Sequence, residues 1–212
     1  MISLAFGVDC YHANPMIENI SVIIPLRPGV NINSELKTLL QRHFLNVLII
    51  NRGGRAENMN IGASRAAGTT LWFLHGDTSL SEENILALVR AVKTHPNAIH
   101  YFNLKFDARG PVRMNAVGAN LRSHIFKLPY GDQGLAFPAE VFHDLGGYDE
   151  TAPYGEDMLL IRKAKKNGVK ICPVQSTLIT SADRYRHQGW LKTTLIFQWR
   201  MWALLFRSLR HG

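Results

Sequence analysis

Two short acidic motifs in this sequence combine residue types that can do chemistry. His75-Gly76-Asp77-Thr78 directly follows an apolar run, and Glu156-Asp157 opens a helix-prone stretch. An imidazole and a carboxylate this close together at a strand end can hold a divalent cation, while water and phosphate oxygens fill the remaining positions. A carboxylate can also accept a proton as a general base. Both motifs have an ordinary structural interpretation too: Asp77 could cap a turn, and acids favour the positive end of a helix dipole.

Two turns contain further candidate binding residues. Gly53-Gly54-Arg55 comes just before a helix-prone stretch. Glycines there permit close backbone approach, and a helix start suits an anion. The polar segment from Pro129 to Gly134 could shape a pocket for a second ligand. Taken alone, each turn is better explained as a solvated connection between two elements.

The hydrophobic pattern predicts the scaffold that must position these residues. Short apolar runs read as buried parallel strands, and amphipathic stretches between them read as helices. Strands are expected at 20–24, 47–50, 71–74, 99–106, 134–137, 169–172 and 177–181. Helices are expected at 56–67, 81–96, 113–127, 156–167 and 189–209, with one more that begins after Asn33 or Ser34 and one that ends at Gly146-Gly147. This alternation indicates an α/β fold: a single, mostly parallel sheet with helices on both faces. Ligands of such sheets collect at the carboxyl ends of the strands, where His75 and Asp77 lie.

Length and charge predict one domain with appendages. The chain has 212 residues, of which 46% are hydrophobic, enough to bury a core of ordinary size. We expect an N-terminal extension over 1–17, the α/β domain over 18–183, and a basic, aromatic-rich C-terminal helix over 184–212. The net charge is +8, and no acid follows Asp183. The tail therefore favours an anionic partner, although its tryptophans form no RNA-binding signature and nucleic acid is not favoured.

Composition also suggests where the protein resides. No stretch reaches the roughly 18 uninterrupted apolar residues that a spanning helix needs. Cys10 and Cys172 have neither metal-ligand spacing nor the density of a disulfide scaffold, which favours a reducing compartment. We therefore expect a cytoplasmic protein. Its C-terminal helix would lead it to the inner face of the membrane or to a partner subunit in a homo-oligomer, or would dock on the domain's own core.

The order of all these motifs along the chain resembles the family 2 glycosyltransferases, in particular a small bacterial subgroup with a His-x-Asp-Thr metal motif. The resemblance begins at Ile20 and covers most of the chain. The stretches that carry it are Ser21 to Pro25, Gly54-Arg55-Ala56 with Met59-Asn60 and Gly62-Ala63, Phe73 to Thr78, Pro129 to Gly134, Gly146-Gly147-Tyr148, Glu156-Asp157, and Ser181 through Arg184-Tyr185 to Gly189-Trp190.

The resemblance implies a glycosyltransferase A fold, of the nucleotide-diphospho-sugar transferase type. It implies a glycosyltransferase that moves a sugar from a nucleotide-diphosphate donor to a hydroxyl acceptor with the help of manganese or magnesium. The implied metal ligands are His75 and Asp77, and the implied catalytic residues are Asp157, as general base, and Glu156. The implied donor-binding residues are Pro25, Asn51, Arg55, Asn60 and Asp77, and the implied acceptor-binding residues are Asp132, Gln133 and Tyr148.

The sequence departs from the family pattern on the donor side. Related enzymes place an Asp after the second strand, where it recognises the nucleotide base, and follow it with a further helix and strand. Here the strand ending at Ile50 runs straight into Asn51 and the Gly-Arg turn. Arg27 and Pro28 also stand where the family has an Asn-Glu pair. An alternative hypothesis is therefore a catalytically degenerate protein that keeps the fold as a binding or scaffolding module.

Overall fold

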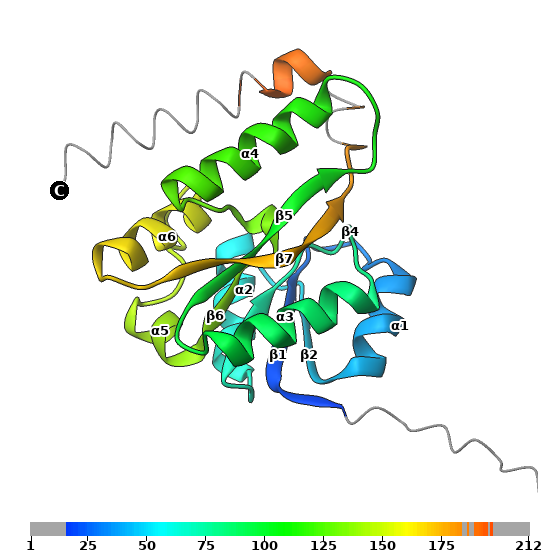
Figure 1. Cartoon of the computed structure of the whole chain (residues 1–212). Helices are drawn as coiled ribbons and strands as arrows, with labels where there is room; N and C mark the ends of the chain where they lie inside the picture. The colour runs from blue at the N-terminus through cyan, green and yellow to red at the C-terminus, as the bar shows by residue number, and fades with distance from the viewer. Residues whose placement is uncertain (1–15, 184–185, 187–188, 195, 197–212) are drawn as a thin grey trace, which may run out of the picture.

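The computed structural model describes residues 16–183, 186, 189–194 and 196, and it centres on one sheet in the order β2-β1-β3-β6-β5-β7-β4 (Figure 1). Its strands are β1 (Ile17–Pro25), β2 (Phe44–Ile50), β3 (Thr70–Phe73), β4 (Thr78–Ser79), β5 (Ile99–Phe106), β6 (Ala136–Pro138) and β7 (Ile171–Thr180). The long pairings of β1 with β2 and β3, and of β5 with β7, are parallel. The short pairings of β4 and β6 are antiparallel. The predicted single, mostly parallel sheet is confirmed.

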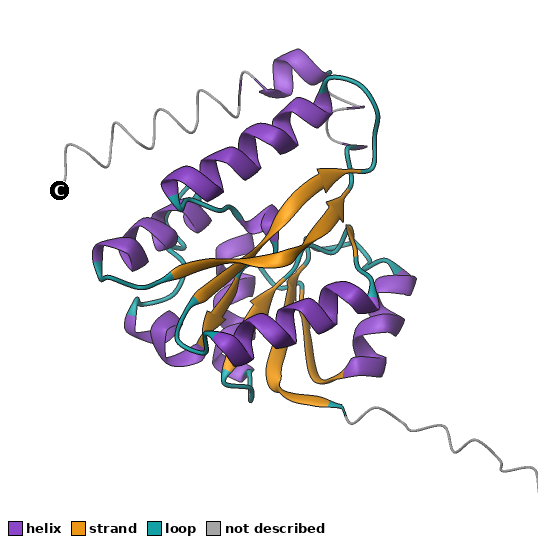
Figure 2. Cartoon of the chain, viewed as in Figure 1, coloured by secondary structure: helices purple, strands orange, loops and turns teal. Residues whose placement is uncertain are grey.

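Helices cover both faces of this sheet (Figure 2). They are α1 (Ser34–His43), α2 (Arg55–Arg65), α3 (Glu82–Thr94), α4 (Val112–Phe126), α5 (Ala139–Asp144) and α6 (Glu156–Lys166), with a short 3-10 helix η1 (Gly131–Gln133). On one face, Leu40 of α1 and Leu88 of α3 belong to a core with Trp72. On the other face, Met59 of α2 and Ile161 of α6 belong to a second core. Burial on both faces explains why the central strands are continuously apolar.

The strand β7 differs from its prediction, and no strand was predicted at the short β4. The sequence predicted two short strands at 169–172 and 177–181, whereas β7 is a single strand that contains Pro173. The pairing of β5 with β7 shifts register between Tyr101 and Asn103, beside that proline. A bulge of this kind lets a strand continue past a residue that has no backbone N–H to donate.

The two predicted appendages fall largely outside the described residues. Residues 1–15 and 197–212 are among those not described, so the N-terminal extension and most of the predicted C-terminal helix are not tested. Residues 190–194 are helical, and Trp190 contacts the small core between α4 and the end of β5. Trp190 Nε1 also donates to Asn115 Oδ1 at 3.3 Å. Within the described chain, we find no helix whose length and apolarity would let it cross a membrane.

Candidate functional site

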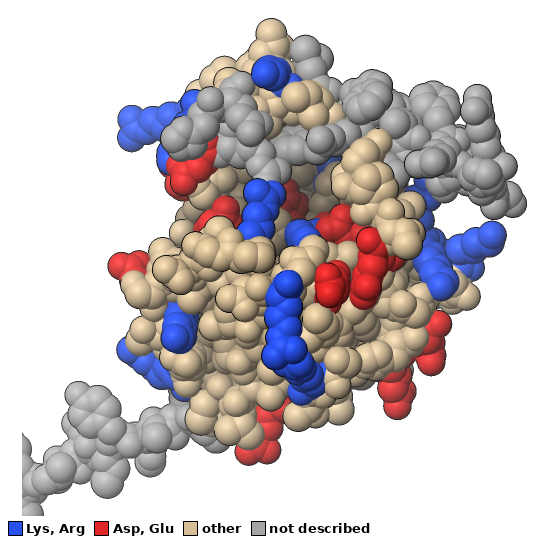
Figure 3. Space-filling view, turned by 180° about the vertical axis from the view of Figure 1, so that it is seen from behind, with Lys and Arg blue, Asp and Glu red and all other residues tan. Residues whose placement is uncertain are grey.

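Arg55 lies at the centre of a cluster of charged side chains. It is the first residue of α2, and its Nη1 donates to Glu156 Oε1 and, at 2.9 Å, to Asp157 Oδ2. Its Nη2 lies 2.9 Å from His75 Nε2, just beyond the end of β3. The structure thus joins three motifs that are far apart in the sequence. The face opposite α1 and α3 is hollowed, and acidic and basic side chains gather around the hollow (Figure 3).

The positive charge of Arg55 offsets the negative charges of two buried carboxylates. Glu156 and Asp157 are only 8% and 9% exposed, in the first turn of α6. Burial on its own would lower the pKa of Arg55, but the charges of Asp157 and Glu156 outweigh it and raise that pKa. The guanidinium therefore stays charged, and removing it would leave two carboxylates without their partner, which is strongly destabilising.

The predicted polar turn lies directly against this ion cluster. A Cβ on Gly131 would be 2.2 Å from Arg55 Nη2 and 2.7 Å from Asp157 Oδ2, so the turn can approach this closely only with glycine. Burial raises the pKa of the neighbouring Asp132, and the charge of Asp157 raises it further, while Arg122 and Arg55 act against this. The Gly131-Asp132 segment therefore belongs to the site.

Gln133 anchors this turn from inside the protein. Its Nε2 donates to the carbonyl of Phe102 at 3.0 Å, and its Oε1 accepts from Ser123 Oγ at 2.7 Å and from the backbone N–H of Tyr130 at 3.2 Å. The side chain is fully buried. These contacts hold η1 in place, and direct contact of Gln133 with an acceptor stays a prediction.

Asn60 and Tyr148 are hydrogen-bonded to each other next to the ion cluster. Asn60 Oδ1 accepts from the backbone N–H of Tyr148, and Asn60 Nδ2 donates to its carbonyl, both at 2.9 Å. Burial raises the pKa of Tyr148 well above its ordinary value, and the carboxylate of Asp157 adds to the effect. The contacts of Asn60 hold the Tyr148 loop beside the ion cluster, while its role in donor binding stays a prediction.

Three buried polar atoms around the cluster have no hydrogen-bond partner in the described part of the chain. They are Asp157 Oδ1, Asp132 Oδ1 and Tyr148 Oη. A buried polar group without a partner costs about 1 to 3 kcal/mol, so such groups are rare outside sites that bind something polar. All three belong to residues that the resemblance places at the catalytic or acceptor position.

Asn58 was not singled out from the sequence, yet it positions Arg55. Its Oδ1 accepts from the backbone N–H groups of Arg52 and Gly53, both at 3.0 Å, and its Nδ2 donates to the carbonyl of Leu26 at 2.9 Å. Asn58 therefore ties the turn before α2 to the end of β1. The available signal was an Asn near a helix start, where its side chain can bond local backbone.

The remaining donor-side residues lie at strand ends. Pro25 ends β1 beside Ile50, the last residue of β2. Asn51 is exposed in the loop that leads from β2 to α2, and Asp77 is exposed just after His75. Since β2 is the edge strand, the predicted absence of a further strand and helix before the Gly-Arg turn is confirmed. The donor-binding roles of these three residues stay predictions.

The side chains as arranged do not by themselves fit a bound metal ion. Among the described residues, no group of three or more His, Cys, Asp or Glu could hold one. His75 Nε2 faces the Arg55 guanidinium, which has only donors, so this nitrogen points at a cation. The predicted metal role of His75 and Asp77 therefore lacks support from the observed geometry.

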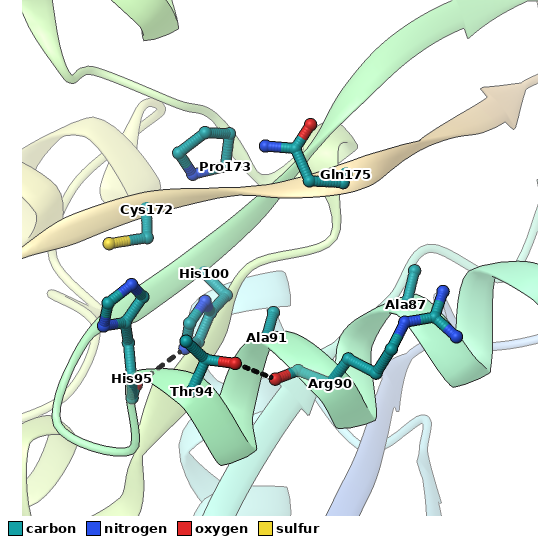
Figure 4. A pocket seen from close by; sticks show the side chains of 9 residues that line it. All are labelled: Ala87, Arg90, Ala91, Thr94, His95, His100, Cys172, Pro173 and Gln175. Atoms are coloured by element: carbon teal, nitrogen blue, oxygen red, sulfur yellow. Dashed lines mark hydrogen bonds between the residues drawn. The ribbon is translucent and has the colours of Figure 1, made fainter.

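A cavity of about 230 Å³ lies elsewhere, between α3 and the amino ends of β5 and β7 (Figure 4). His100 Nε2 donates to the carbonyl of His95 there at 2.9 Å, and burial lowers the pKa of His100. Cys172 also lines the cavity. Because this is the opposite end of the parallel strands from His75, the cavity is separate from the Arg55 cluster.

Comparison with known proteins identifies the fold. No protein-family model and no curated protein matches the sequence. Among solved structures, residues 1–349 of TarS from S. aureus superpose with a TM-score of 0.56 at 16% identity, over 77% of this chain and 60% of that one. The same TarS fragment in complex with UDP-GlcNAc gives 0.55 at 17% identity, over 77% and 58%.

A second enzyme, GalNAc-T7 with UDP, GalNAc and Mn²⁺, superposes with a TM-score of 0.51 at 14% identity, over 77% of this chain and 44% of that one. This chain therefore spans less than two thirds of the length of each of these neighbours. At these identities the likeness concerns the fold. The sheet order, the helices on both faces and these superpositions together show that the chain has the glycosyltransferase A fold.

Proposed function

We propose that this protein is a glycosyltransferase that moves a sugar from a nucleotide-diphosphate donor to a hydroxyl acceptor. The observation that carries the proposal is the unpartnered, buried Asp157 Oδ1, which lies beside Asp132 and Tyr148 and next to Arg55. The fold neighbours support the donor class, since TarS was solved with UDP-GlcNAc and with UDP.

Asp157 is the proposed general base. Arg55 Nη1 donates to Asp157 Oδ2, which holds the carboxylate in one orientation and leaves Oδ1 to accept from the acceptor hydroxyl. As the acceptor oxygen bonds to the anomeric carbon, the bond from that carbon to the donor phosphate oxygen breaks and the hydroxyl proton passes to Asp157. Glu156 shares the guanidinium and orients it.

Donor binding is proposed at the amino end of α2. The backbone there follows Gly53-Gly54, and a helix N-terminus attracts phosphate. Binding of manganese or magnesium near His75 and Asp77 also stays a prediction, and Mn²⁺ in the GalNAc-T7 structure supports it.

Asp157→Asn tests the base. The amide keeps the shape of the side chain and loses its basicity, so we expect turnover to fall by about 10² to 10⁴ while donor binding changes little. Transfer and hydrolysis are measured over a panel of nucleotide sugars, with and without manganese, and donor binding by calorimetry. The control is Asp144→Asn, an exposed acid of α5, which should keep wild-type turnover. Near-wild-type turnover in folded Asp157→Asn would remove this residue from the mechanism.

The exposed Asn51 at the end of the edge strand favours one alternative, a degenerate module that binds without catalysis. It predicts that the wild-type protein binds nucleotide sugars but neither transfers nor hydrolyses them, with or without manganese. The same experiment therefore distinguishes the two functions.

A further inference from the structure

Helix α4 carries an apolar stripe on the side that faces solvent. Five of the eleven large hydrophobic side chains exposed in the described chain belong to this one helix: Met114, Val117, Leu121, Ile125 and Phe126. Val117 is 67% exposed and Ile125 is 61% exposed. A concentration of this kind on one element is unusual for a surface that meets only water.

The stripe lies opposite the face by which α4 is attached. Val112, Ala116, Ala119 and Ser123 are the buried residues of the helix. At 100° per residue, Val117, Leu121 and Ile125 point to the opposite side. Helix α4 is thus apolar on two faces, but only one of them packs against the rest of the protein. Leu191, which is also exposed, extends the apolar surface from a segment hydrogen-bonded to α4 through Asn115.

The charged residues within α4 and directly beside its two ends are positive. Arg109, Arg113 and Lys127 are exposed, and no Asp or Glu occurs between Asp107 and Asp132. Lys192, on the neighbouring segment, is exposed too. A second copy of the same face would bring these like charges together, whereas an anionic surface would be attracted to them.

We propose that the solvent-facing stripe of α4, together with its basic rim, docks the protein onto an anionic lipid bilayer. The apolar side chains enter the boundary between headgroups and acyl chains, and the arginines and lysines contact phosphate headgroups, as in helices that lie in the plane of a membrane interface. This surface is independent of the proposed chemistry, and it is centred on α4 rather than on the C-terminal helix that the sequence suggested.

The test is co-sedimentation of the full-length protein with phosphatidylcholine vesicles, with and without admixed phosphatidylglycerol. We expect binding to the anionic vesicles only, weakened by salt. Replacing Val117, Leu121 and Ile125 together by Gln should lower the partition coefficient about tenfold or more. A matched triple variant, with Val30, Leu45 and Leu86 replaced by Gln, changes exposed apolar residues elsewhere and should bind like the wild type.

The rim is tested separately. Arg109→Gln with Arg113→Gln should weaken binding to anionic vesicles more than Lys37→Gln with Arg65→Gln, a pair of exposed basic residues on α1 and α2. The proposal fails if the wild type does not sediment with vesicles or if the stripe and control variants bind equally. It also fails if light scattering shows a dimer that only the stripe variant breaks, because a second copy then covers α4. A melting temperature lowered only in the stripe variant would mean that the chain itself covers it.

Discussion

The folded protein opposes the ionisation of Asp132. Burial raises its pKa above the ordinary value of 3.8. Below that pH the folded and unfolded chains both hold the proton. As the pH rises from there through the raised folded pKa, the unfolded chain binds fewer protons than the folded one, so the free energy of unfolding falls.

Asp132→Asn removes this penalty while keeping the shape of the side chain. We expect the variant to melt at a higher temperature than the wild type at neutral pH, with the difference vanishing below pH 3.8. Thermal denaturation over this range of pH measures it, with Asp144→Asn as the control. If the melting temperatures of wild type and variant instead differ by the same amount at every pH, Asp132 ionises in the folded protein as freely as in the unfolded chain.

The residues that the sequence could identify are those with a local signal. His75, Arg55 and Asp157 each follow a strand or open a helix, and their order along the chain resembled a family pattern. Asn58 offered only the local signal of an Asn near a helix start, and the sequence did not reveal the partners of Asn58 or Arg122. Asn58 bonds the carbonyl of Leu26, and the Arg122 guanidinium lies 3.6 Å above the ring of Tyr130. Such contacts exist only after the sheet has brought the segments together.

One short element, η1, limits how closely the segments that form the site can pack together. The turn at η1 meets the ion cluster with its backbone, and the Cβ of an alanine at Gly131 would overlap Arg55 Nη2 and Asp157 Oδ2. We expect Gly131→Ala to displace the guanidinium, lower the free energy of unfolding by about 1 to 3 kcal/mol and abolish most activity. Denaturant unfolding and a transfer assay measure these effects.

Gly118 provides the matched control for this substitution. It lies in α4, and a Cβ there meets no atom within 4 Å. Alanine in a helix interior is favoured over glycine by about 0.5 to 1 kcal/mol, so Gly118→Ala should stabilise the protein and leave activity unchanged. Equal effects of the two substitutions would mean that the approach of η1 to the cluster is not what limits the site.

Element boundaries show why part of the fold was predictable. The helix start at Glu156 follows Gly155, whose φ of +74° suits glycine before a helix, and acids in the first turn marked it in the sequence. The continuity of β7 was not predictable, because it depends on a shift in its pairing with β5. Pairing partners are set by the whole sheet, whereas the helix start is a local property.

At the scale of the molecule, the strand order determines which strand near the site is an edge strand. Among the described strands, β1 and β3 have a neighbour on each side, whereas β2 is an edge strand and pairs only with β1. The loop after β2 leads directly to α2, as expected from the point at which the sequence departs from the family pattern. A base held at this edge would meet the ends of β1 and β2, with Asn51 exposed beside them.

This architecture predicts a donor site that selects bases weakly. The amino end of α2 can bind the diphosphate of any nucleotide, while the edge at β2 offers the base few contacts. We expect UDP, GDP and ADP to bind within about tenfold of one another, which corresponds to about 1.4 kcal/mol. The corresponding monophosphates should bind more weakly, because they lack one phosphate. Asn51→Asp, which adds a carboxylate that can accept from uracil N3–H, should strengthen UDP binding selectively. Calorimetry with each nucleotide measures both effects, and a preference of more than about a hundredfold for one base in the wild type would show that the edge at β2 recognises the base after all.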